Sequence, residues 1–353
     1  MKKIDKSIEI VRSSIIGLSS MSQKSCNAAF DVLSSHYSTV KIVAIDNLLD
    51  LEVLVLRKPD LVFLGMEFIP VDPSLVDRDQ NKIWITTYLD ENGITYTGSP
   101  QPAHELQRDK PSAKQRVLDS GLVTSPFLVI KQGEIIDRNN MTLKYPLFIK
   151  PRDRGGGVGI DSNSVAYNFE QLIAKVRSIA SSLQSDAIIE EYLPGREFSV
   201  AILKDVSSAD YNVMPIELIA PKDRNGVRML SNKVKTSDTE QIVEVNDEKI
   251  RAKVNAIALG VFYALGARDY GRIDIRLDEN GKPNFLEANL IPSLINGYGS
   301  FPRACIINSN ISYESMIMKI AELGLSNSRD IIEDLIVAAP IDNSVLATRE
   351  AVA

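Results

Sequence analysis

Apolar runs rich in β-branched residues alternate with helical patterns in the first hundred residues of the chain. The strand patterns are IEIVRSSIIGL, VKIVAI, DLVFLG and ITYTGS, and the helical patterns run from about Ser22 to Ser35 and from about Ile83 to Leu89. Strands that alternate with helices are typical of a parallel sheet with helices on its faces. Because Pro100 and Pro102 interrupt this pattern, we predict an α/β domain over residues 1–101.

The pattern then changes to closely spaced strands, with one helix inserted at about Phe169 to Ser181. The strands are PFLVI, YPLFIKP, AIIEEYL, REFSVAIL and VMPIELI, which predict α+β structure. A polar stretch of low periodicity, PKDRNGVRMLSNKVKTSDTE, is long enough to be a functional loop or lid. A long helix, the hairpin GRIDIRL-DENGKP-NFLEANL and a helix over about Tyr313–Leu323 follow. We predict α+β subdomains over 102–195 and 196–325, and a tail of uncertain order over 326–353.

Composition narrows the class of partner. The 353 residues include 40 Lys and Arg against 46 Asp and Glu, so the net charge of −6 does not favour nucleic acid or an anionic membrane. No run approaches the roughly 18 apolar residues of a membrane span, and Asp5, Glu9 and Arg12 interrupt any secretion signal. Cys26 and Cys305 are far apart, which suits a reducing cytoplasm. We expect small-molecule partners.

Candidate chemistry begins on the predicted hairpin. Side chains alternate across a strand, so Arg272 and Asp274 share one face, and Glu287 and Asn289 share a face of the partner strand. Two carboxylates and an amide oxygen that converge there would form an all-oxygen site suited to Mg²⁺, which accepts phosphate oxygens as further ligands.

The alternative for these residues is a solvated polar face of the hairpin. That alternative is weakened by the apolar neighbours Ile273, Ile275, Phe285 and Leu286, which we expect to anchor the opposite face. Two adjacent carboxylates also repel each other unless a cation lies between them.

The loop RGGGVGI, residues 154–160, follows a predicted strand and matches neither a P-loop nor a dinucleotide-binding fingerprint. Its glycines leave backbone N–H groups free to close over phosphate, with Val158 packed to hold the flap down and Lys150 supplying a charge. The glycines are Gly155, Gly156, Gly157 and Gly159. The alternative is a flexible hairpin tip with a surface lysine.

The stretch IIEEYLPGREF could hold a flat base. The carboxylate of Glu190 would accept a hydrogen bond from an exocyclic amino group, and the backbone around Tyr192 and Leu193 would contact the ring edge. The alternative is a strand end with solvated glutamates.

Taken in order, K-P, the glycine flap, E-E-Y-L-x-G-x-E-F-x-V and G-R-I-D-I-R-L followed by F-L-E-A-N resemble the ATP-grasp ligases, most closely the D-Ala-D-Ala ligase family. The likeness runs from about Gly17 to Leu323. It implies an ATP-grasp fold, in which an N-terminal parallel α/β domain precedes two α+β subdomains that clasp ATP. It also implies a ligase that phosphorylates a carboxylate with ATP and joins it to an amine.

The resemblance implies a role for each matched residue. The expected nucleotide contacts are Lys110, Lys150, the flap Gly155, Gly156, Gly157, Val158 and Gly159, the adenine-binding Glu190, Glu191, Tyr192 and Leu193, and Glu197 near the ribose. The expected ligands of two Mg²⁺ ions, for which Mn²⁺ could substitute, are Asp274, Glu287 and Asn289. The expected catalytic residues are Arg272, which stabilises the tetrahedral oxyanion, Lys233 of the lid, and Ser293 of the oxyanion turn.

The chain departs from the family in the expected substrate site. Met21 stands where the family has a Glu that binds the ammonium group of the first amino acid, Val234 replaces a lid Tyr, and Ser293 replaces a turn Gly. Asn296 and Tyr298 complete the expected substrate set. A thioether opposite a charged ammonium group is unfavourable, so we expect a first substrate other than a free D-amino acid.

Several functions remain open on the sequence alone. The leading hypothesis is a ligase that joins an amino acid to a small acid, or to a conjugated ketone as in mycosporine-like amino acid synthesis, so that the product is an amide or an imine. An orthodox D-Ala-D-Ala ligase and a non-catalytic ATP-binding module are the alternatives. The resemblance also allows a homodimer.

Overall fold

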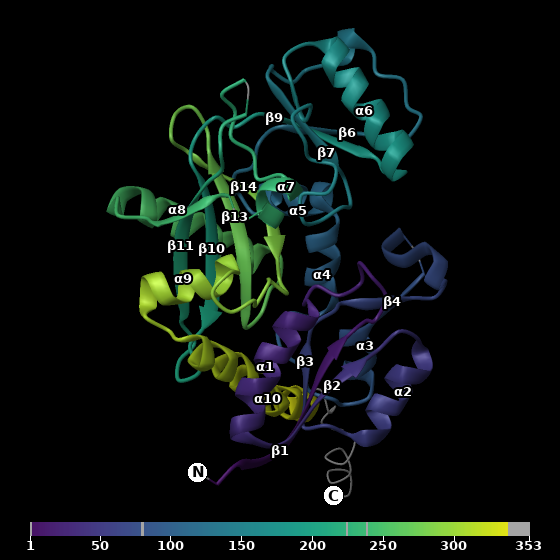
Figure 1. The fold of residues 1–353 in the computed structure, drawn as a ribbon, viewed down its shortest axis with the longest axis vertical. Helices are drawn as coiled ribbons and strands as arrows, with labels where there is room; N and C mark the ends of the chain where they lie inside the picture. Colours follow the sequence, from purple (N-terminus) through teal and green to yellow (C-terminus); the bar gives the residue numbers. More distant parts are fainter. Residues whose placement is uncertain (1, 79–80, 224, 238, 338–353) are drawn as a thin grey trace, which may run out of the picture.

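The computed structural model describes residues 2–78, 81–223, 225–237 and 239–337. It opens with a parallel sheet of order β2-β1-β3, as the sequence predicts, and helices flank this sheet (Figure 1). Its elements are β1 (Ile4–Arg12), α1 (Gln23–His36), β2 (Tyr37–Ala44), α2 (Leu48–Arg57) and β3 (Leu61–Leu64). The prediction did not include α2. The predicted strand ITYTGS forms only an isolated bridge from Tyr96 to Val62.

Short elements connect this sheet to the rest of the molecule. An antiparallel pair and several helices carry the chain away from it. They are β4 (Phe68–Pro70), η1 (Pro73–Arg78), β5 (Lys82–Trp84), α3 (Ile85–Glu91), α4 (Gln101–Arg108) and α5 (Lys110–Asp119). Helix α4 lies where the sequence predicted only a boundary, because Pro102 falls in its first turn, where a missing N–H costs nothing.

The second sheet is antiparallel with the order β6-β9-β7-β8, and α6 packs on one face (Figure 1). It contains β6 (Phe127–Ile130), β7 (Leu147–Pro151), β8 (Val165–Ala166), α6 (Phe169–Leu183) and β9 (Ala187–Glu191), with a turn of 3₁₀ helix, η2 (Arg138–Asn140), before β7. Hairpin-connected strands beside one helix match the α+β prediction.

The third sheet has the order β12-β11-β10-β13-β14 and both faces are covered, by α8 and by α9. Its elements are β10 (Glu197–Lys204), β11 (Tyr211–Ile219), α7 (Asn232–Ser237), β12 (Gln241–Glu244), α8 (Glu248–Ala264), β13 (Tyr270–Leu277), β14 (Pro283–Asn289) and α9 (Ser300–Ser309). Side chains of β10 alternate accordingly: Val200 packs in the α8 core, and Ala201 packs in the core that includes α9.

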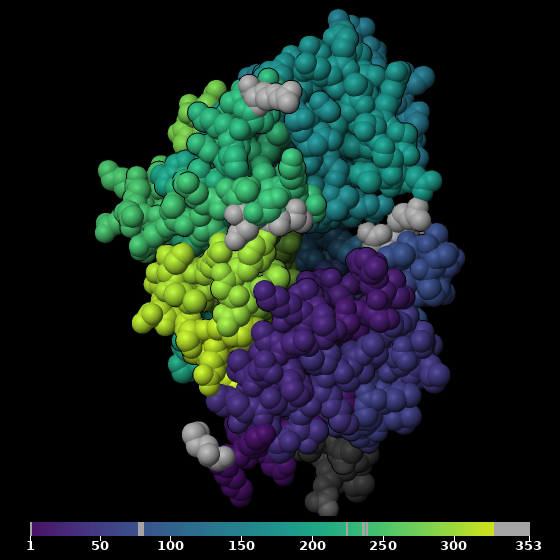
Figure 2. Space-filling view, in the orientation of Figure 1, coloured from purple at the N-terminus to yellow at the C-terminus, as the bar shows by residue number. Residues whose placement is uncertain are grey.

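The last helix, α10 (Tyr313–Val337), returns the chain to the first sheet, where it packs against β3 and α1. Figure 2 shows this yellow segment against the purple N-terminal segment. The sequence predicted that the helix ends near Gly324, but Gly324 lies inside it. A Cβ there would lie 2.7 Å from Leu61 Cδ1, so the glycine permits close packing of α10 on β3.

The combination of a parallel α/β sheet with antiparallel α+β sheets confirms the predicted fold class. The divisions at 101 and 195 stay predictions. The predicted tail of uncertain order, 326–353, is wrong over 326–337, where α10 continues, and 338–353 lie outside the described residues. None of the helices in the described part of the chain combines the length and apolar character that crossing a membrane requires.

Candidate nucleotide and metal site

Most of the predicted nucleotide contacts line one cleft, formed by residues of the second and third sheets. The residues of the predicted sets that do so are Lys150, Gly157, Glu190, Glu191, Tyr192, Leu193, Glu197, Asp274 and Glu287. Ile160, Met229 and Leu286 add apolar surface to the same lining. An apolar slot with a few polar groups at its edge suits a purine base with phosphates beyond it.

The β13–β14 hairpin places its carboxylates as predicted. Asp274 pairs directly with Glu287, and Arg272 pairs with Asn289. The register then shifts between Asp274 and Ile275, and such an irregularity turns the following side chains.

This irregularity corrects one prediction about the hairpin. Phe285 is buried in the core as expected, but Leu286 lines the cleft and does not anchor the opposite face.

A second cavity adjoins the first at Glu287, which lines both. Lys110, Gly155 and Asn289, which are also predicted site residues, line it too. Lys110 is buried and its Nζ donates to the carbonyl oxygen of Arg154. Burial lowers the pKa of Lys110 to about 8, although Glu287 opposes the shift. The two cavities together would separate a base from phosphate and metal.

Glu190 lies between two lysines, one of which the sequence analysis missed. Its Oε1 is 3.1 Å from Nζ of Lys150 and 3.1 Å from Nζ of Lys114. Burial raises the pKa of Glu190, but the two ion pairs outweigh this and hold its pKa below the usual range. Lys114 falls four residues after Lys110, hence on the same face of α5, and this spacing was the available signal.

Arg276 connects the nucleotide cleft to the lid loop. Its guanidinium donates to Glu197 Oε2 at 2.9 Å, to the Tyr192 hydroxyl at 2.9 Å and to the carbonyl of Arg228 at 3.0 Å. Glu197 and Tyr192 belong to the stretch EEYLPGREF, which the sequence analysis assigned to the base and ribose, and Arg228 belongs to the lid loop. Arg276 thus orients Glu197 and Tyr192.

The glycine flap contacts the lid. The side-chain amide of Asn232, the first residue of α7, donates to the carbonyl oxygen of Gly156 at 3.2 Å. Gly157 lies so near that a Cβ would be 2.8 Å from the backbone nitrogen of Asn232. The flap is therefore closed against the lid, which would exclude water from the phosphates.

Val158 does not hold the flap down, contrary to the prediction, because its side chain is 40% exposed. Gly159 makes the close contact instead. A Cβ at Gly159 would lie 2.6 Å from Pro151 Cγ and 2.7 Å from Leu183 Cδ1. The absence of a side chain at this position lets the flap rest on β7 and the end of α6.

The proposed metal ligands are all hard oxygen donors, which fits Mg²⁺. The carboxylate of Asp274 accepts two hydrogen bonds from Arg272, at 2.9 and 2.8 Å, and one from the Ser199 hydroxyl at 2.9 Å. The side-chain amide of Asn289 lies 3.5 Å from the same carboxylate. The described residues contain no group of three or more His, Cys, Asp or Glu that could hold a metal ion, so the proposed site depends on two carboxylates and one amide oxygen.

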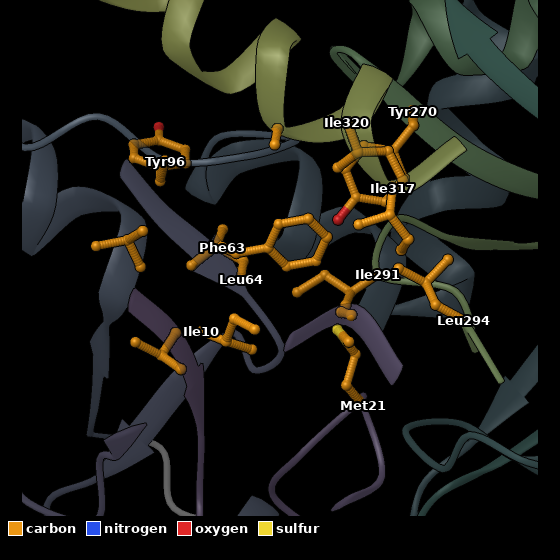
Figure 3. Close-up of a cluster of buried hydrophobic side chains, with 14 of the residues drawn as sticks. Ile10, Met21, Phe63, Leu64, Tyr96, Tyr270, Ile291, Leu294, Ile317 and Ile320 are labelled. Carbon is orange, nitrogen blue, oxygen red and sulfur yellow. The ribbon is translucent and has the colours of Figure 1, made fainter. Parts of the chain in front are cut away.

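The structure corrects the assignment of Met21 to the substrate site. Its side chain is fully buried in the first hydrophobic core, and Figure 3 shows it directed toward the cluster that contains Phe63 and Ile291. A Cβ on the neighbouring Gly65 would lie 3.2 Å from Met21 Cβ. Met21 is a packing residue in this fold.

The remaining expected residues are less closely grouped. Lys233 and Val234 lie on α7, and Asn296 is exposed. Ser293 and Tyr298 are partly buried in the connection between β14 and α9. Neither of the two cavities is lined by these five residues, so their roles stay predictions.

A buried carboxylate that the sequence analysis did not select, Glu67, lies beside the second cavity. Its Oε1 accepts from Gln107 Nε2 at 2.6 Å and from the Ser20 hydroxyl at 3.5 Å, and Arg108 lies 3.4 Å from Oε2. Gln107 and Arg108 line the cavity. Glu67 follows β3, and the carboxyl ends of parallel strands are frequent ligand sites, so its position was a usable signal.

The family model described as "D-ala D-ala ligase C-terminus" matches residues 117–322, which contain most of the cleft. The chain belongs to the D-Ala-D-Ala ligase family. A D-alanine–D-alanine ligase of Cupriavidus metallidurans is 30% identical over 234 residues, 66% of this chain and 68% of that protein. One of Hydrogenovibrio crunogenus is 26% identical over 245 residues, 68% of this chain and 73% of that protein.

Solved structures confirm the ATP-grasp fold of this family member. The D-alanine–D-alanine ligase of Bacillus anthracis complexed with ATP superposes with a TM-score of 0.70 at 20% identity, covering 92% of this chain and 99% of that one. The enzyme of Coxiella burnetii gives 0.68 at 15% identity, over 94% and 97% of the chains. The protein is an ATP-grasp ligase that forms C–N bonds and uses ATP with Mg²⁺.

Proposed function

We propose that this ligase phosphorylates a small carboxylate, or a conjugated ketone oxygen, and joins the activated group to the amine of an amino acid. The observation that carries the proposal is the packing of residue 21. The family's ammonium-binding glutamate is replaced by Met21, and its side chain is enclosed in the core. That position offers no charge to a free D-amino acid.

The buried carboxylate of Glu67 does not restore the lost charge. Gln107 donates to one of its oxygens and the guanidinium of Arg108 lies beside the other. The charged residues that line the cavity beside it are Arg108, Lys110 and Arg154 against Asp153 and Glu287, an excess of one positive charge. This arrangement favours a substrate whose charged group is an anion over one that presents an ammonium group.

The reaction follows from the poor leaving group of a carboxylate. The substrate oxygen attacks the terminal phosphorus of ATP, the bond to ADP breaks, and an acyl phosphate forms. The amine then attacks the carbonyl carbon, inorganic phosphate leaves, and the amine loses a proton. On a conjugated ketone, ATP phosphorylates the ketone oxygen, the amine attacks the carbon that carries it, phosphate leaves, and loss of both N–H protons gives an imine.

The predicted site residues have proposed roles in these reaction steps. Lys110 and Lys150 would bind nucleotide phosphates, and Asp274, Glu287 and Asn289 would hold Mg²⁺, which spreads the charge of the transferring phosphoryl group.

Arg272 would face the negative oxygen of the tetrahedral intermediate. Because Arg272 is paired with Asp274, it is already within reach of the metal side of the site. The closed flap and lid would protect the acyl phosphate from water.

An orthodox D-Ala-D-Ala ligase is the second candidate, because the relatives at 30% and 26% identity carry that name. The two candidates differ in one requirement. An orthodox enzyme must bind the ammonium group of its first D-alanine, and this requires a carboxylate with a free oxygen. A ligase whose first substrate is a small acid without an amino group, or a conjugated ketone as in mycosporine-like amino acid synthesis, has no such need.

ADP release distinguishes the candidates. The purified protein would be incubated with ATP and Mg²⁺, with D-alanine alone and with amino acids paired with small acids or with mycosporine-glycine. We expect turnover only with a pair. Turnover with D-alanine alone, at the rate of the best pair, would establish the orthodox reaction and refute the proposal.

The control for this assay is Glu287→Gln, which removes one charge from the proposed metal set. We expect a loss of about 100-fold or more in turnover, because the metal charge at the phosphoryl group contributes several kcal/mol, with an unchanged melting temperature. Near-normal turnover in this variant would contradict the metal assignment.

The proposed setting is the cytoplasm, where ATP is available and where the two buried cysteines stay as free thiols. A homodimer and the domain divisions at 101 and 195 stay predictions of the resemblance.

A further inference from the structure

Lys114 is a fully buried lysine behind the nucleotide cleft, next to Glu190. It lies on α5, and its side chain has no exposed surface. A charged group in such a place is costly unless it is paired. Its position therefore needs an explanation beyond packing.

The ammonium group of Lys114 is saturated by protein partners. Its Nζ lies 2.6 Å from the Thr124 hydroxyl, 3.4 Å from the carbonyl oxygen of Phe285, and 3.1 Å from Glu190 Oε1. The first two contacts are hydrogen bonds and the third is an ion pair, and the side chain has no exposed surface through which a ligand could reach it. It also does not line the nucleotide cleft, whereas Glu190 does.

Lys150 approaches the same carboxylate from the cleft. Its Nζ is 3.1 Å from Glu190 Oε1, and its side chain is part of the cleft lining. The group contains two buried cations and one buried anion, so it carries one net positive charge. If Lys114 were neutral, Glu190 and Lys150 would form a pair with no net charge.

We infer that Lys114 is a positioning residue for ATP: it neutralises Glu190 from behind, so that the ammonium group of Lys150 keeps its charge for the nucleotide phosphates. A pair of opposite buried charges resists separation, since neither has water to replace its partner. With Lys114 in place, Lys150 contacts phosphate without leaving Glu190 uncompensated.

The electrostatics of the group are consistent with this assignment. Burial lowers the pKa of Lys114 to about 8, and Glu190 opposes the shift. Lys114 therefore stays mostly protonated at neutral pH.

The competing explanation is purely structural. Lys114 also ties α5 to Thr124 and to the β14 carbonyl of Phe285, and Thr124 donates to the same carbonyl at 2.7 Å. Under that explanation the charge is unimportant and only the hydrogen bonds matter. Removing the charge while keeping donors separates the two.

The test compares Lys114→Gln with Lys114→Met. Glutamine is neutral but retains donors for Thr124 and Phe285, whereas methionine retains neither. The readouts are the Kd of ATP with Mg²⁺, measured by titration calorimetry without any acceptor substrate, and the melting temperature. Because no ligation is measured, a negative result here is independent of the proposed substrates.

The chain offers a matched control in Arg57→Gln. Arg57 pairs with the buried carboxylate of Glu9 at 2.6 Å, on α2 and β1, away from the cleft (Figure 1). This variant likewise removes a cation from a buried carboxylate. It is expected to lower the melting temperature and to leave the Kd of ATP unchanged.

We expect both Lys114 variants to raise the Kd of ATP about tenfold or more. In a Glu190→Gln background, where no carboxylate needs neutralising, the further effect of Lys114→Gln on Kd should shrink to less than about threefold. Lys114→Gln with a wild-type Kd would overturn the inference, and so would equal effects of Lys114→Gln in the wild-type and Glu190→Gln backgrounds.

Discussion

The contact between flap and lid makes a quantitative prediction for Gly157→Ala. Gly157 has a φ of +77°, and a Cβ there would lie 2.8 Å from the backbone nitrogen of Asn232 and 3.1 Å from the carbonyl carbon of Ser231. Gly156 has a φ of +63°, and a Cβ there would meet nothing within 4 Å. The two alanine variants therefore share a backbone penalty and differ in one steric clash.

The magnitude follows from these two terms. An alanine at positive φ costs about 1–2 kcal/mol in either variant. Ordinary contact begins at 3.4 Å, so the Cβ of Gly157→Ala overlaps Asn232 by 3.4 − 2.8 = 0.6 Å. The overlap is with backbone that cannot rotate away, and overpacking of this kind costs about 1–3 kcal/mol. The clash alone separates the two variants, and about 1–3 kcal/mol corresponds to a ratio of about 5 to 150 between their Kd values for ATP.

The assay is the Kd of ATP with Mg²⁺ for both variants, together with the rate of ADP release on one substrate pair. We expect Gly157→Ala to raise the Kd of ATP at least fivefold more than Gly156→Ala does, because the clash opposes closure of the flap against the lid. Equal values for the two variants would show that flap and lid do not meet when ATP binds, and would refute the reasoning from the contact distances.

Two further variants test other contacts. Arg276→Met removes the donors to Glu197 and Tyr192 and the ion pair with Glu197, so it should raise the Kd of ATP about tenfold, measured by calorimetry. An unchanged Kd would show that Arg276 does not orient the nucleotide contacts. Asn327→Leu removes the 2.9 Å hydrogen bond from α10 to buried Asp269. It should lower the free energy of unfolding by about 1–3 kcal/mol in thermal melts and leave the Kd of ATP unchanged. A wild-type melting curve would show that this contact does not stabilise the packing of α10.

The hairpin was predictable because short-range rules determine it. Alternation along two strands and the turn DENGKP predict the hairpin and the shared face of Arg272 and Asp274. A regular register would pair Asp274 with Leu286, so the observed pairing with Glu287 depends on the irregularity before Ile275, which the alternation does not predict. The glycine flap was predictable for a similar reason, since few sequences place four glycines after a strand. Both predictions needed only neighbours in sequence.

Predictions failed where packing between distant segments decides. Gly324 was interpreted as a helix end, since glycine commonly ends helices, but β3 lies close enough at Leu61 to require glycine inside the helix. Lys114 was overlooked because its spacing from Lys110 indicates only a shared helix face, whereas its burial depends on Thr124, Phe285 and Glu190 from other elements. Val158 was given a contact that Gly159 makes, because loop direction depends on Pro151.

The interpretation of the first-substrate site differs most between the sequence and the structure. Met21 was matched to the family's glutamate by its spacing from Gly17 and Ser19, but its enclosure in the core means that a glutamate there would be buried. Restoring the family residue would therefore destabilise the protein without recreating an ammonium site.

Another carboxylate, Glu67, comes from a different loop and lies beside the second cavity. Its Oε1 is held by Gln107 at 2.6 Å, and Gln107 also accepts from the backbone N–H of Leu290, next to the proposed metal ligand Asn289. The contact of Oε2 with Arg108 is longer, at 3.4 Å. An ammonium group would have to displace Arg108, whereas an anionic group could use Arg108 as it stands, and this difference favours a first substrate without an amino group.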